Sequence, residues 1–399
     1  MAFVAQFPIV RIPTADGGCV AVKRRPVPGG PPVVFVHGLA VNADLWDLPE
    51  VSGPNFRYRS LAALAQAAGY DVWLVNLRGH GAPHMLSEPA PGQTDWCVDH
   101  FIAYDMPAVV DHVQAATGRR PLAIGASMGS MTLAGFLQGA HFAGHGEAAR
   151  VAADPALAAR RQAQLSGAVF AEFPAALRWP AGLYGPDGRL RWRALARNWW
   201  RTDGDVNHAF ELMARWGWLQ AVLTAVGEVP LTRFRGSPER EPWYAGFPSV
   251  LRERAERLER SALQAALRAA GTFTGATNQR AEVLLRGRRF VLDDMKAGVL
   301  RQMAKCVRAG AFVSDTGAPD HVYSDHYDAL TLPILVVQGG RDRIASPSVV
   351  RSAFYERVRS ADKELLYDEA LAHGEIEAAP VACERLYPQI LSWFDRHRP

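Results

Sequence analysis

The sequence predicts an α/β protein with a mostly parallel central sheet, helices on both faces of that sheet, and one large helical insertion. Three observations lead to this prediction. Apolar runs alternate with helical patterns through residues 31–173, which is typical of parallel strands joined by helices. The segment from Gly125 to Gly129 has the pattern of a strand, a sharp turn and a helix. The strand pattern then stops between Pro174 and about Asp328, and it resumes at Ile334.

The expected strands are apolar runs bounded by Gly, Pro or Asp. They cover residues 4–12, 19–27, 33–39, 71–76, 122–124 and 166–173 before the insertion, and residues 334–338 and 363–367 after it. The first two are joined by a turn at Asp16-Gly17-Gly18 and form a hairpin. The strands from residue 33 onward alternate with helical segments, so we expect most of them to pair in parallel.

Two helices are expected between the early strands. The first covers residues 58–68, with Leu61 and Leu64 on one face and Gly69 as its stop signal. The second begins at Asp105, which we expect to cap it, and it has Pro107 in its first turn. Both helices present apolar residues at helical spacing, so both are expected to cover the sheet.

The turn at residues 125–129 has the pattern G-x-S-x-G, with Ser127 in its centre. Between a buried strand and a helix, this pattern predicts a nucleophile elbow, a strained turn that holds the serine hydroxyl clear of the backbone. Gly125 and Gly129 are expected because a side chain at either position would clash with the neighbouring strand and helix. Without that context, the same five residues would indicate only a Gly/Ser turn.

A serine hydroxyl needs a general base, and the base needs a carboxylate that orients it. Where the nucleophile lies on such an elbow, the chain order is serine, acid, histidine. Asp342 follows the expected strand 334–338, and His373 follows the expected strand 363–367, so these are the candidate acid and base. Singly, an aspartate in this turn would be a helix cap, and His373 would be a surface-loop residue. Asp368 and Glu369 are alternative candidates for the acid, and His326 is the alternative candidate for the base.

The tetrahedral oxyanion of acyl transfer needs two backbone N–H donors. Met128 follows the nucleophile and supplies the first. Leu39 follows His37-Gly38 after the expected strand 33–39 and supplies the second. His37 itself is expected to brace this loop and to take no part in the triad.

These motifs resemble the α/β-hydrolase superfamily, and within it the acid lipases (gastric and lysosomal lipases and their bacterial relatives). The similar segments are HGLAVNADLW (37–46), AGYDVWLVNLRGHG (68–81), YDMPAVVDHV (104–113) and the elbow. The resemblance implies the α/β-hydrolase fold and a carboxylic ester hydrolase with a lid. Ala126 and Met128 stand where those lipases usually have His and Gln. The Ser-Met-Gly elbow also resembles acyltransferases of the same superfamily.

The segment between the two groups of strands is expected to be a helical cap over the active site. We therefore expect a hydrolase core at 1–173 and 329–399, and a cap (lid) at 174–328. A helical pattern with i,i+4 Glu–Arg pairs runs from Leu251 to Ala270. Seven of the eleven tryptophans lie in the cap, namely Trp179, Trp192, Trp199, Trp200, Trp216, Trp218 and Trp243. Most are expected to pack within the cap and a few to line an apolar pocket, and the substrate-binding residues are unassigned.

The composition argues against several other kinds of protein. The chain has 399 residues, of which 49% are hydrophobic and 21% charged, as in ordinary globular proteins. The net charge of +4 gives no case for nucleic acid. The four cysteines are widely spaced and form no C-x-x-C pair, which indicates neither a zinc site nor a disulfide scaffold. The acidic and histidine residues of the linker 320–328 lack a recognised metal-ligand spacing, so we expect no metal and no cofactor.

The N-terminal stretch has no basic region and carries Gln6 and Pro8, so it does not resemble a signal peptide. No run is long and apolar enough for a transmembrane segment, and we expect a cytoplasmic protein. The predicted function is a serine hydrolase that cleaves carboxylic esters with an apolar acyl or aromatic part. The alternatives are a serine acyltransferase with the same triad and a non-catalytic ligand-binding protein on the same scaffold. The expected partner is a small-molecule or lipid-like ester, and the oligomeric state is not predicted.

Overall fold

The computed structural model describes residues 7–53, 55–144, 149–178 and 291–398, with short pieces at 228–229, 248–251, 254, 257–258, 261, 278 and 283. Most of the predicted cap, including its seven tryptophans, lies outside the described residues. No helix in the described part is both long and apolar enough to cross a lipid bilayer.

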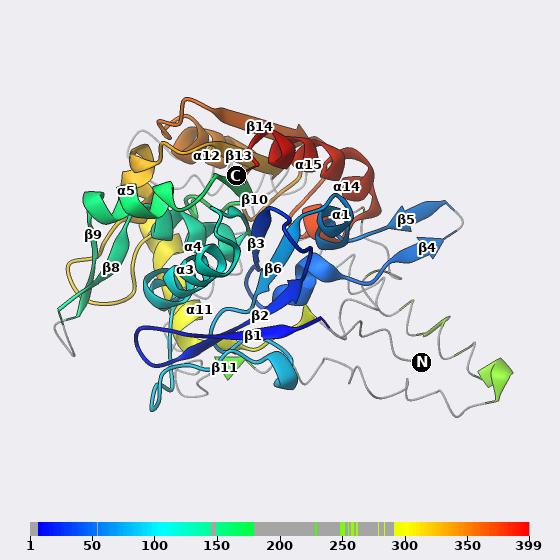
Figure 1. Cartoon of the computed structure of the whole chain (residues 1–399), viewed down its shortest axis with the longest axis horizontal. Helices are drawn as coiled ribbons and strands as arrows, with labels where there is room; N and C mark the ends of the chain where they lie inside the picture. The colour runs from blue at the N-terminus through cyan, green and yellow to red at the C-terminus, as the bar shows by residue number, and fades with distance from the viewer. Residues whose placement is uncertain are drawn as a thin grey trace, which may run out of the picture.

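Eight strands form the central sheet (Figure 1). In chain order they are β1 (Ile9–Pro13), β2 (Cys19–Arg25), β3 (Pro32–Val36), β6 (Asp71–Val75), β7 (Leu122–Ala126), β10 (Gly167–Ala171), β13 (Ile334–Gly339) and β14 (Lys363–Asp368). Their order across the sheet is β1-β2-β6-β3-β7-β10-β13-β14. The hairpin β1–β2 and the pair β2–β6 are antiparallel, and every pair from β6 to β14 is parallel. The carboxyl ends of six parallel strands therefore meet at one edge.

Short two-stranded pairs lie outside the main sheet. They are β4 (Val51–Gly53) with β5 (Phe56–Tyr58), β8 (Ala140–Ala143) with β9 (Arg150–Ala153), and β11 (Glu228–Val229) with β12 (Met295–Lys296). The last pair shows that the segment 174–328 is not entirely helical, contrary to the sequence pattern. The hairpin β4–β5 projects from the body of the protein in Figure 1.

The first half of the chain forms short helical turns and longer helices. They are η1 (Ala43–Asp47), α1 (Leu61–Ala67), η2 (Pro83–Met85), α2 (Val98–His100), η3 (Phe101–Asp105), α3 (Met106–Thr117), α4 (Met128–Leu137) and α5 (Pro155–Ala163). Those of the second half are α11 (Ala297–Ala309), η7 (Tyr323–Ala329), α12 (Pro347–Val350), η8 (Arg351–Tyr355), α13 (Glu375–Ala378), α14 (Pro380–Arg385) and α15 (Tyr387–Arg396).

Helices cover both faces of the sheet, as Figure 1 shows, with α3, α4 and α11 on one side and α1, α14 and α15 on the other. The alternation of side chains along β3 divides the core accordingly. Val34 and Val36 pack in the cluster with α3 and α4, whereas Val33 and Phe35 pack in the cluster with α1 and α15. All four side chains are fully buried. This two-sided burial explains why the strands are continuous apolar runs.

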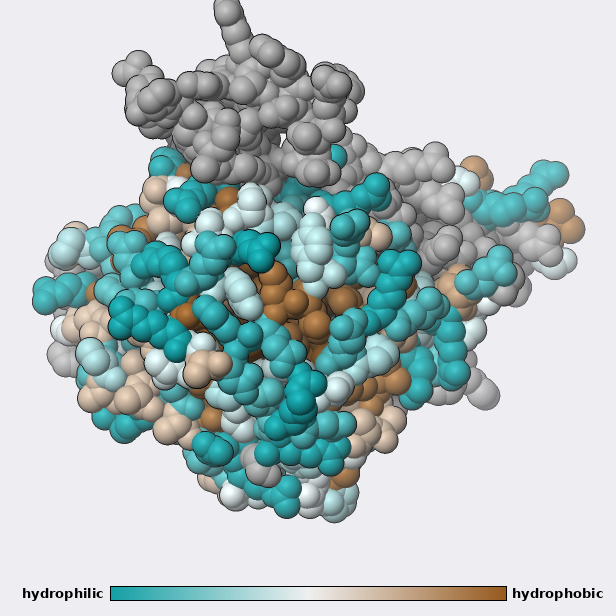
Figure 2. Space-filling model, turned by 90° about the horizontal axis from the view of Figure 1, so that it is seen from above, coloured by the Kyte–Doolittle hydropathy of each residue, from teal (hydrophilic) through white to brown (hydrophobic). Residues whose placement is uncertain are grey.

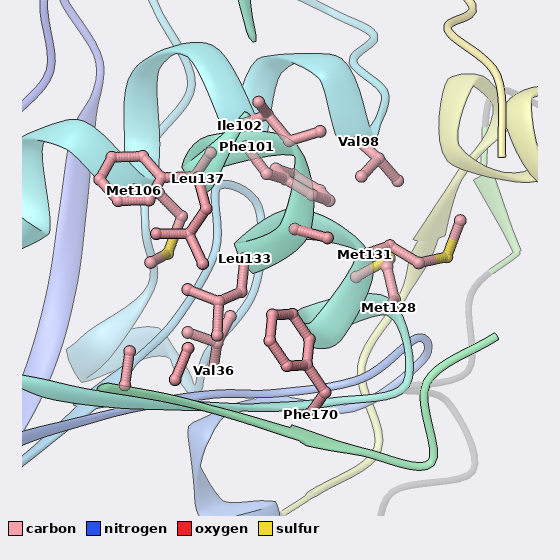
Figure 3. Close-up of a cluster of buried hydrophobic side chains, with 14 of the residues drawn as sticks. Val36, Val98, Phe101, Ile102, Met106, Met128, Met131, Leu133, Leu137 and Phe170 are labelled. Carbon is pink, nitrogen blue, oxygen red and sulfur yellow. The ribbon is translucent and has the colours of Figure 1, made fainter. Parts of the chain in front are cut away.

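The buried elbow helix α4 is the centre of the larger cluster. Figure 3 shows its side chains, including Leu133 and Leu137, between Phe101 and Ile102 of η3 and Val36 and Phe170 of the sheet. Since every residue of α4 is buried, the position of the helix relative to the sheet is set by packing on both sides. From above, apolar surface is gathered at the centre of the visible face and ringed by polar residues (Figure 2).

The α/β class, the mostly parallel sheet and the helices on both faces are confirmed. Two local predictions are wrong. Tyr58 ends strand β5, and the helix begins at Leu61 because Ser60 caps it by accepting a hydrogen bond from the Ala63 N–H. Asp105 does not cap a helix, because the chain is already helical from Val98 and its carboxylate binds elsewhere.

The last part of the segment assigned to the cap packs against the core. Val299 and Met303 of α11, with Tyr323 of η7, belong to the larger hydrophobic cluster. Gln302 of α11 donates a hydrogen bond to Asp99 of α2, 2.7 Å away. The division into core and cap stays a prediction. These contacts attach the C-terminal part of the predicted cap segment to the helices beside the elbow.

Candidate active site

Ser127 lies on the sharp turn between β7 and α4, where the sequence predicts it. Its φ is +51°, a left-handed conformation that L-residues rarely adopt. The turn leaves no room for side chains at its two glycines. A Cβ on Gly125 would lie 2.5 Å from the backbone of Gly129, and one on Gly129 would lie 2.5 Å from the Val36 carbonyl oxygen. The turn is held further by the Ser127 N–H, which donates to the Ala171 carbonyl at 2.9 Å.

The structure brings Ser127, His373 and Asp342 together in a hydrogen-bonded relay. His373 Nε2 lies 3.0 Å from Ser127 Oγ, and its Nδ1 lies 3.0 Å from Asp342 Oδ2. Ser127 and His373 are partly exposed, whereas Asp342 is 2% exposed. With Nδ1–H donating to the carboxylate, Nε2 is free to accept the serine proton. The hydroxyl and the imidazole are thus partly open to solvent, whereas the carboxylate is buried.

Parallel pairing of β13 with β14 explains how the acid and the base meet. The two strands end at the same edge, with Gly339 opposite Asp368, and Asp342 and His373 follow in the turns beyond. Asp342 Oδ1 accepts hydrogen bonds from the backbone N–H groups of Ile344 (2.9 Å) and Ala345 (2.7 Å). The backbone of its own turn thus holds Asp342, as expected for an aspartate that caps a helix. Its other carboxylate oxygen orients His373.

The charge environment favours the protonated form of His373. Burial lowers the pKa of this histidine, but the negative charges of Asp342 and Glu172 outweigh burial and raise the pKa to about 9. Glu172 was not identified from the sequence. It follows β10, is 1% exposed, and its Oε2 lies 3.8 Å from His373 Nδ1. The signal that could have found it is its place after the strand next to the elbow strand, since functional groups gather at the carboxyl ends of parallel strands.

The two candidate oxyanion donors come from the chain segments next to Ser127, one at the start of α4 and the other in the loop after β3. Met128 is the first residue of α4, so its N–H has no acceptor within the helix. Leu39 follows Gly38, whose Cβ position would lie 3.3 Å from Ser127 Cβ. In the part of the chain that the structure describes, no protein acceptor is found for the Leu39 N–H. The positions of both donors are compatible with the predicted oxyanion hole.

His37 braces this loop, as expected, and is not part of the relay. Its Nδ1 hydrogen-bonds the Gly38 carbonyl (2.8 Å), and its Nε2 accepts from the Leu77 N–H (3.1 Å). Burial and the neighbouring His80 lower its pKa well below the ordinary value. The ring is therefore neutral and links the ends of β3 and β6.

The other acids and base considered from the sequence lie away from the relay. Asp368 accepts from the Ala370 N–H and pairs with Arg385, 3.3 Å away. Glu369 is exposed, and His326 is exposed and stacks on His321 with ring centroids 5.0 Å apart. None of the three contacts His373 or Ser127.

Among the described residues, one group of potential metal ligands has donor atoms within 4.8 Å of one another, namely Glu172, Asp342 and His373. Both ring nitrogens of His373 are engaged by Asp342 and Ser127, and both oxygens of Glu172 accept backbone N–H groups. We therefore interpret the group as a hydrogen-bonded network. In the linker 320–328, Asp320 and Asp328 form ion pairs with Lys305 and Arg359.

Arg78, from the segment shared with the lipases, has a structural role. Its guanidinium is 1% exposed and pairs with Asp105 at 2.7 Å and with Asp16 at 2.6 Å. The Arg78 N–H also donates to Asp105 (2.9 Å). The prediction that Asp105 caps a helix is wrong because its carboxylate fixes the loop after β6.

Comparison with known proteins agrees with the architecture. The model of the alpha/beta hydrolase fold family matches residues 31–139. Triacylglycerol lipase 2 of Arabidopsis thaliana is 33% identical over 132 residues, which cover 32% of this chain and 28% of that protein. Human gastric triacylglycerol lipase is 35% identical over 136 residues, which cover 31% of this chain and 32% of that protein. The chain thus matches about a third of the length of these relatives.

Solved structures match along the whole chain at low identity. An esterase from Thermogutta terrifontis has a TM-score of 0.50 at 16% identity, with 98% of this chain and 100% of that chain covered. DcsB in complex with its substrate analogue has a TM-score of 0.52 at 13% identity, with the same coverage. These likenesses concern the fold alone. Together with the strand order and the family match over residues 31–139, they show that the chain has the α/β-hydrolase fold and that about a third of it is similar to the gastric-type lipases.

Proposed function

We propose that the protein is a serine hydrolase that cleaves carboxylic esters through an acyl-enzyme. The observation that carries this proposal is the relay in which His373 Nε2 lies 3.0 Å from Ser127 Oγ and Nδ1 lies 3.0 Å from Asp342. In that geometry Ser127 attacks the ester carbonyl, His373 takes the hydroxyl proton and returns it to the leaving alcohol, and Asp342 fixes the imidazole. The N–H groups of Leu39 and Met128 stabilise the oxyanion. Water then releases the acid by the same steps.

The lipases that are similar over about a third of this chain support an ester as the substrate. We further propose that residues 174–328 form a cap over Ser127 and select esters with an apolar acyl or aromatic part. An apolar group gains about 25 cal/mol for each Å² that it buries.

Hydrolysis of nitrophenyl esters by the purified protein, before and after Ser127→Ala, tests the proposal. The variant should fold, because Ser127 is partly exposed, and should lose activity by on the order of 10⁴-fold or more. A fluorophosphonate should label the wild type at Ser127 and leave the variant unlabelled. Near-wild-type turnover by Ser127→Ala would refute the mechanism. Adding alcohols to the same assay separates hydrolysis from acyl transfer, because an acyltransferase would form the new ester in preference to the free acid.

A further inference from the structure

Glu172 follows Ala171, the residue whose carbonyl binds the backbone of Ser127. The Ala171 carbonyl accepts the Ser127 N–H at 2.9 Å. Glu172 itself has φ +49°, a left-handed conformation that is unusual for a glutamate. Its own N–H donates to the Val337 carbonyl at 3.0 Å, which ties the end of β10 to β13. Backbone strain of this kind persists only where surrounding contacts impose it, and the Glu172 side chain supplies several such contacts.

The Glu172 carboxylate holds the chain that follows His373. Its Oε2 accepts from the Gly374 N–H at 2.7 Å, and its Oε1 accepts from the Ile376 N–H at 3.1 Å. The same Oε2 lies 3.8 Å from His373 Nδ1. Ala171 and Glu172 therefore fix the nucleophile on one side and the loop of the base on the other.

A second buried glutamate lies against the first. Glu377, in α13, is 2% exposed and its side chain interacts with that of Glu172, while the Oε1 atom of Glu377 has no hydrogen-bond partner within the described residues. Among the described residues, Asp342 also acts on this pair. Glu375, in the same helix as Glu377, accepts from the Ala372 N–H at 2.9 Å. Two carboxyl groups in contact in a dry site cannot both be ionised. Burial and repulsion from Glu377 raise the pKa of Glu172 well above its ordinary value. Burial and repulsion from Asp342 raise the pKa of Glu377 to about 7, although its interaction with Glu172 opposes this shift.

We propose that Glu172 is a positioning residue of the active site, which fixes the loop that carries His373 and places a second negative charge beside its ring, and that it shares one proton with Glu377. This inference deepens the proposed function and rests on it for its kinetic part. The shared proton gives the pair a single negative charge near neutral pH. The single negative charge of the pair thus stabilises the imidazolium that forms when His373 takes the serine proton. The site then holds the charge of Asp342 and one further negative charge, not two.

The test compares three variants. Glu172→Gln keeps the size of the side chain and removes its charge. Glu172→Asp keeps the charge but is too short to keep both hydrogen bonds to Gly374 and Ile376. Glu377→Gln is the matched control, since it removes the other member of the pair and leaves Glu172 as a carboxylate. His373 is assigned among the twelve histidines from the resonance that disappears in His373→Ala, and its pKa is read by NMR titration of labelled protein.

We expect Glu172→Gln to lower the pKa of His373 by about one unit or more, because a nearby negative charge stabilises the imidazolium. Glu377→Gln should not lower it. Glu172→Asp should keep the pKa within about half a unit of wild type while kcat for the nitrophenyl ester falls by about tenfold and KM changes little. If Glu172 were merely structural, both variants would lower stability and kcat. The pKa of His373 would then not depend on whether the charge of Glu172 is kept.

The inference is overturned if Glu172→Gln leaves the His373 pKa unchanged, if Glu377→Gln lowers it equally, or if Glu172→Asp has the wild-type kcat. The NMR titration needs no turnover. A wild-type protein that hydrolyses no ester and is not labelled at Ser127 would therefore refute the proposed function and leave the titration result to be judged separately.

Discussion

The charge on His373 controls the proposed reaction, so activity should depend on pH over an unusually alkaline range. Only the neutral imidazole can accept the Ser127 proton. Its pKa in the folded protein is about 9, raised by Asp342 and Glu172 against the effect of burial. We therefore expect the acid limb of the kcat/KM profile to lie near pH 9, and not near the ordinary histidine value of about 6.5.

The size of the effect follows from the titration curve. With a pKa of about 9, about 1% of His373 is neutral at pH 7 and about half at pH 9, so kcat/KM should rise about fiftyfold between them. A histidine with the ordinary pKa of about 6.5 would give a rise of only about 1.3-fold over the same range.

Initial rates with a nitrophenyl ester from pH 6 to about pH 10 measure this limb. Ser127→Ala at each pH supplies the blank, because it corrects for alkaline hydrolysis of the ester. A profile that is flat between pH 7 and pH 9 would refute the proposed charge environment.

The stability of the folded protein should have the opposite dependence on pH. Because the folded-state pKa is raised, protonated His373 stabilises the fold fully below about pH 6.5, and this contribution is lost as pH rises through about 9.

Three further predictions concern other parts of the molecule. Asp342→Asn should lower kcat by about 10⁴-fold or somewhat less, because the imidazole loses its orienting charge, and His373→Ala should lose more; equal kcat in Asp342→Asn and wild type would show that another acid acts. Arg78→Met should cost about 3–5 kcal/mol in chemical denaturation, because it leaves Asp105 buried and unpaired, and adding Asp105→Asn should recover part of that loss; no recovery would contradict the pairing. For nitrophenyl esters, kcat/KM should rise from acetyl to hexanoyl by up to about fourfold per buried methylene; a profile with acetyl best would contradict an apolar cap.

The sheet and the relay could be predicted from the sequence because their signals are local. Each of Ser127, Asp342 and His373 follows a strand and lies in or next to a turn that contains glycine. Parallel pairing then brings the turns to one edge, so that correct strands almost determine which side chains meet. The order of serine, acid and histidine supplied the remaining constraint.

What could not be predicted depends on contacts between segments far apart in the chain. Asp105 resembles a helix cap until Arg78, 27 positions earlier, is seen to bind it. Tyr58 fits a helical pattern, but its hydroxyl donates to the Glu377 carbonyl at 2.6 Å, from 319 residues away. Glu172 follows a strand without any turn motif, and its partners lie about 200 positions further on, at Gly374 (202) and Ile376 (204). Local patterns contain no information about such pairings.

The separation of Ser127 from His373 by 246 positions has a consequence for synthesis and folding. Strands β3, β6, β7 and β10 neighbour one another in the sheet and leave the ribosome before β13 and β14 (Figure 1). The contacts that hold the elbow, through Ala171 and Gly38, belong to this early group. The strained serine can thus be in place while its base is still unsynthesised. A nascent chain would hold a formed but inactive nucleophile until the last two strands pair with the sheet, since distant contacts form late.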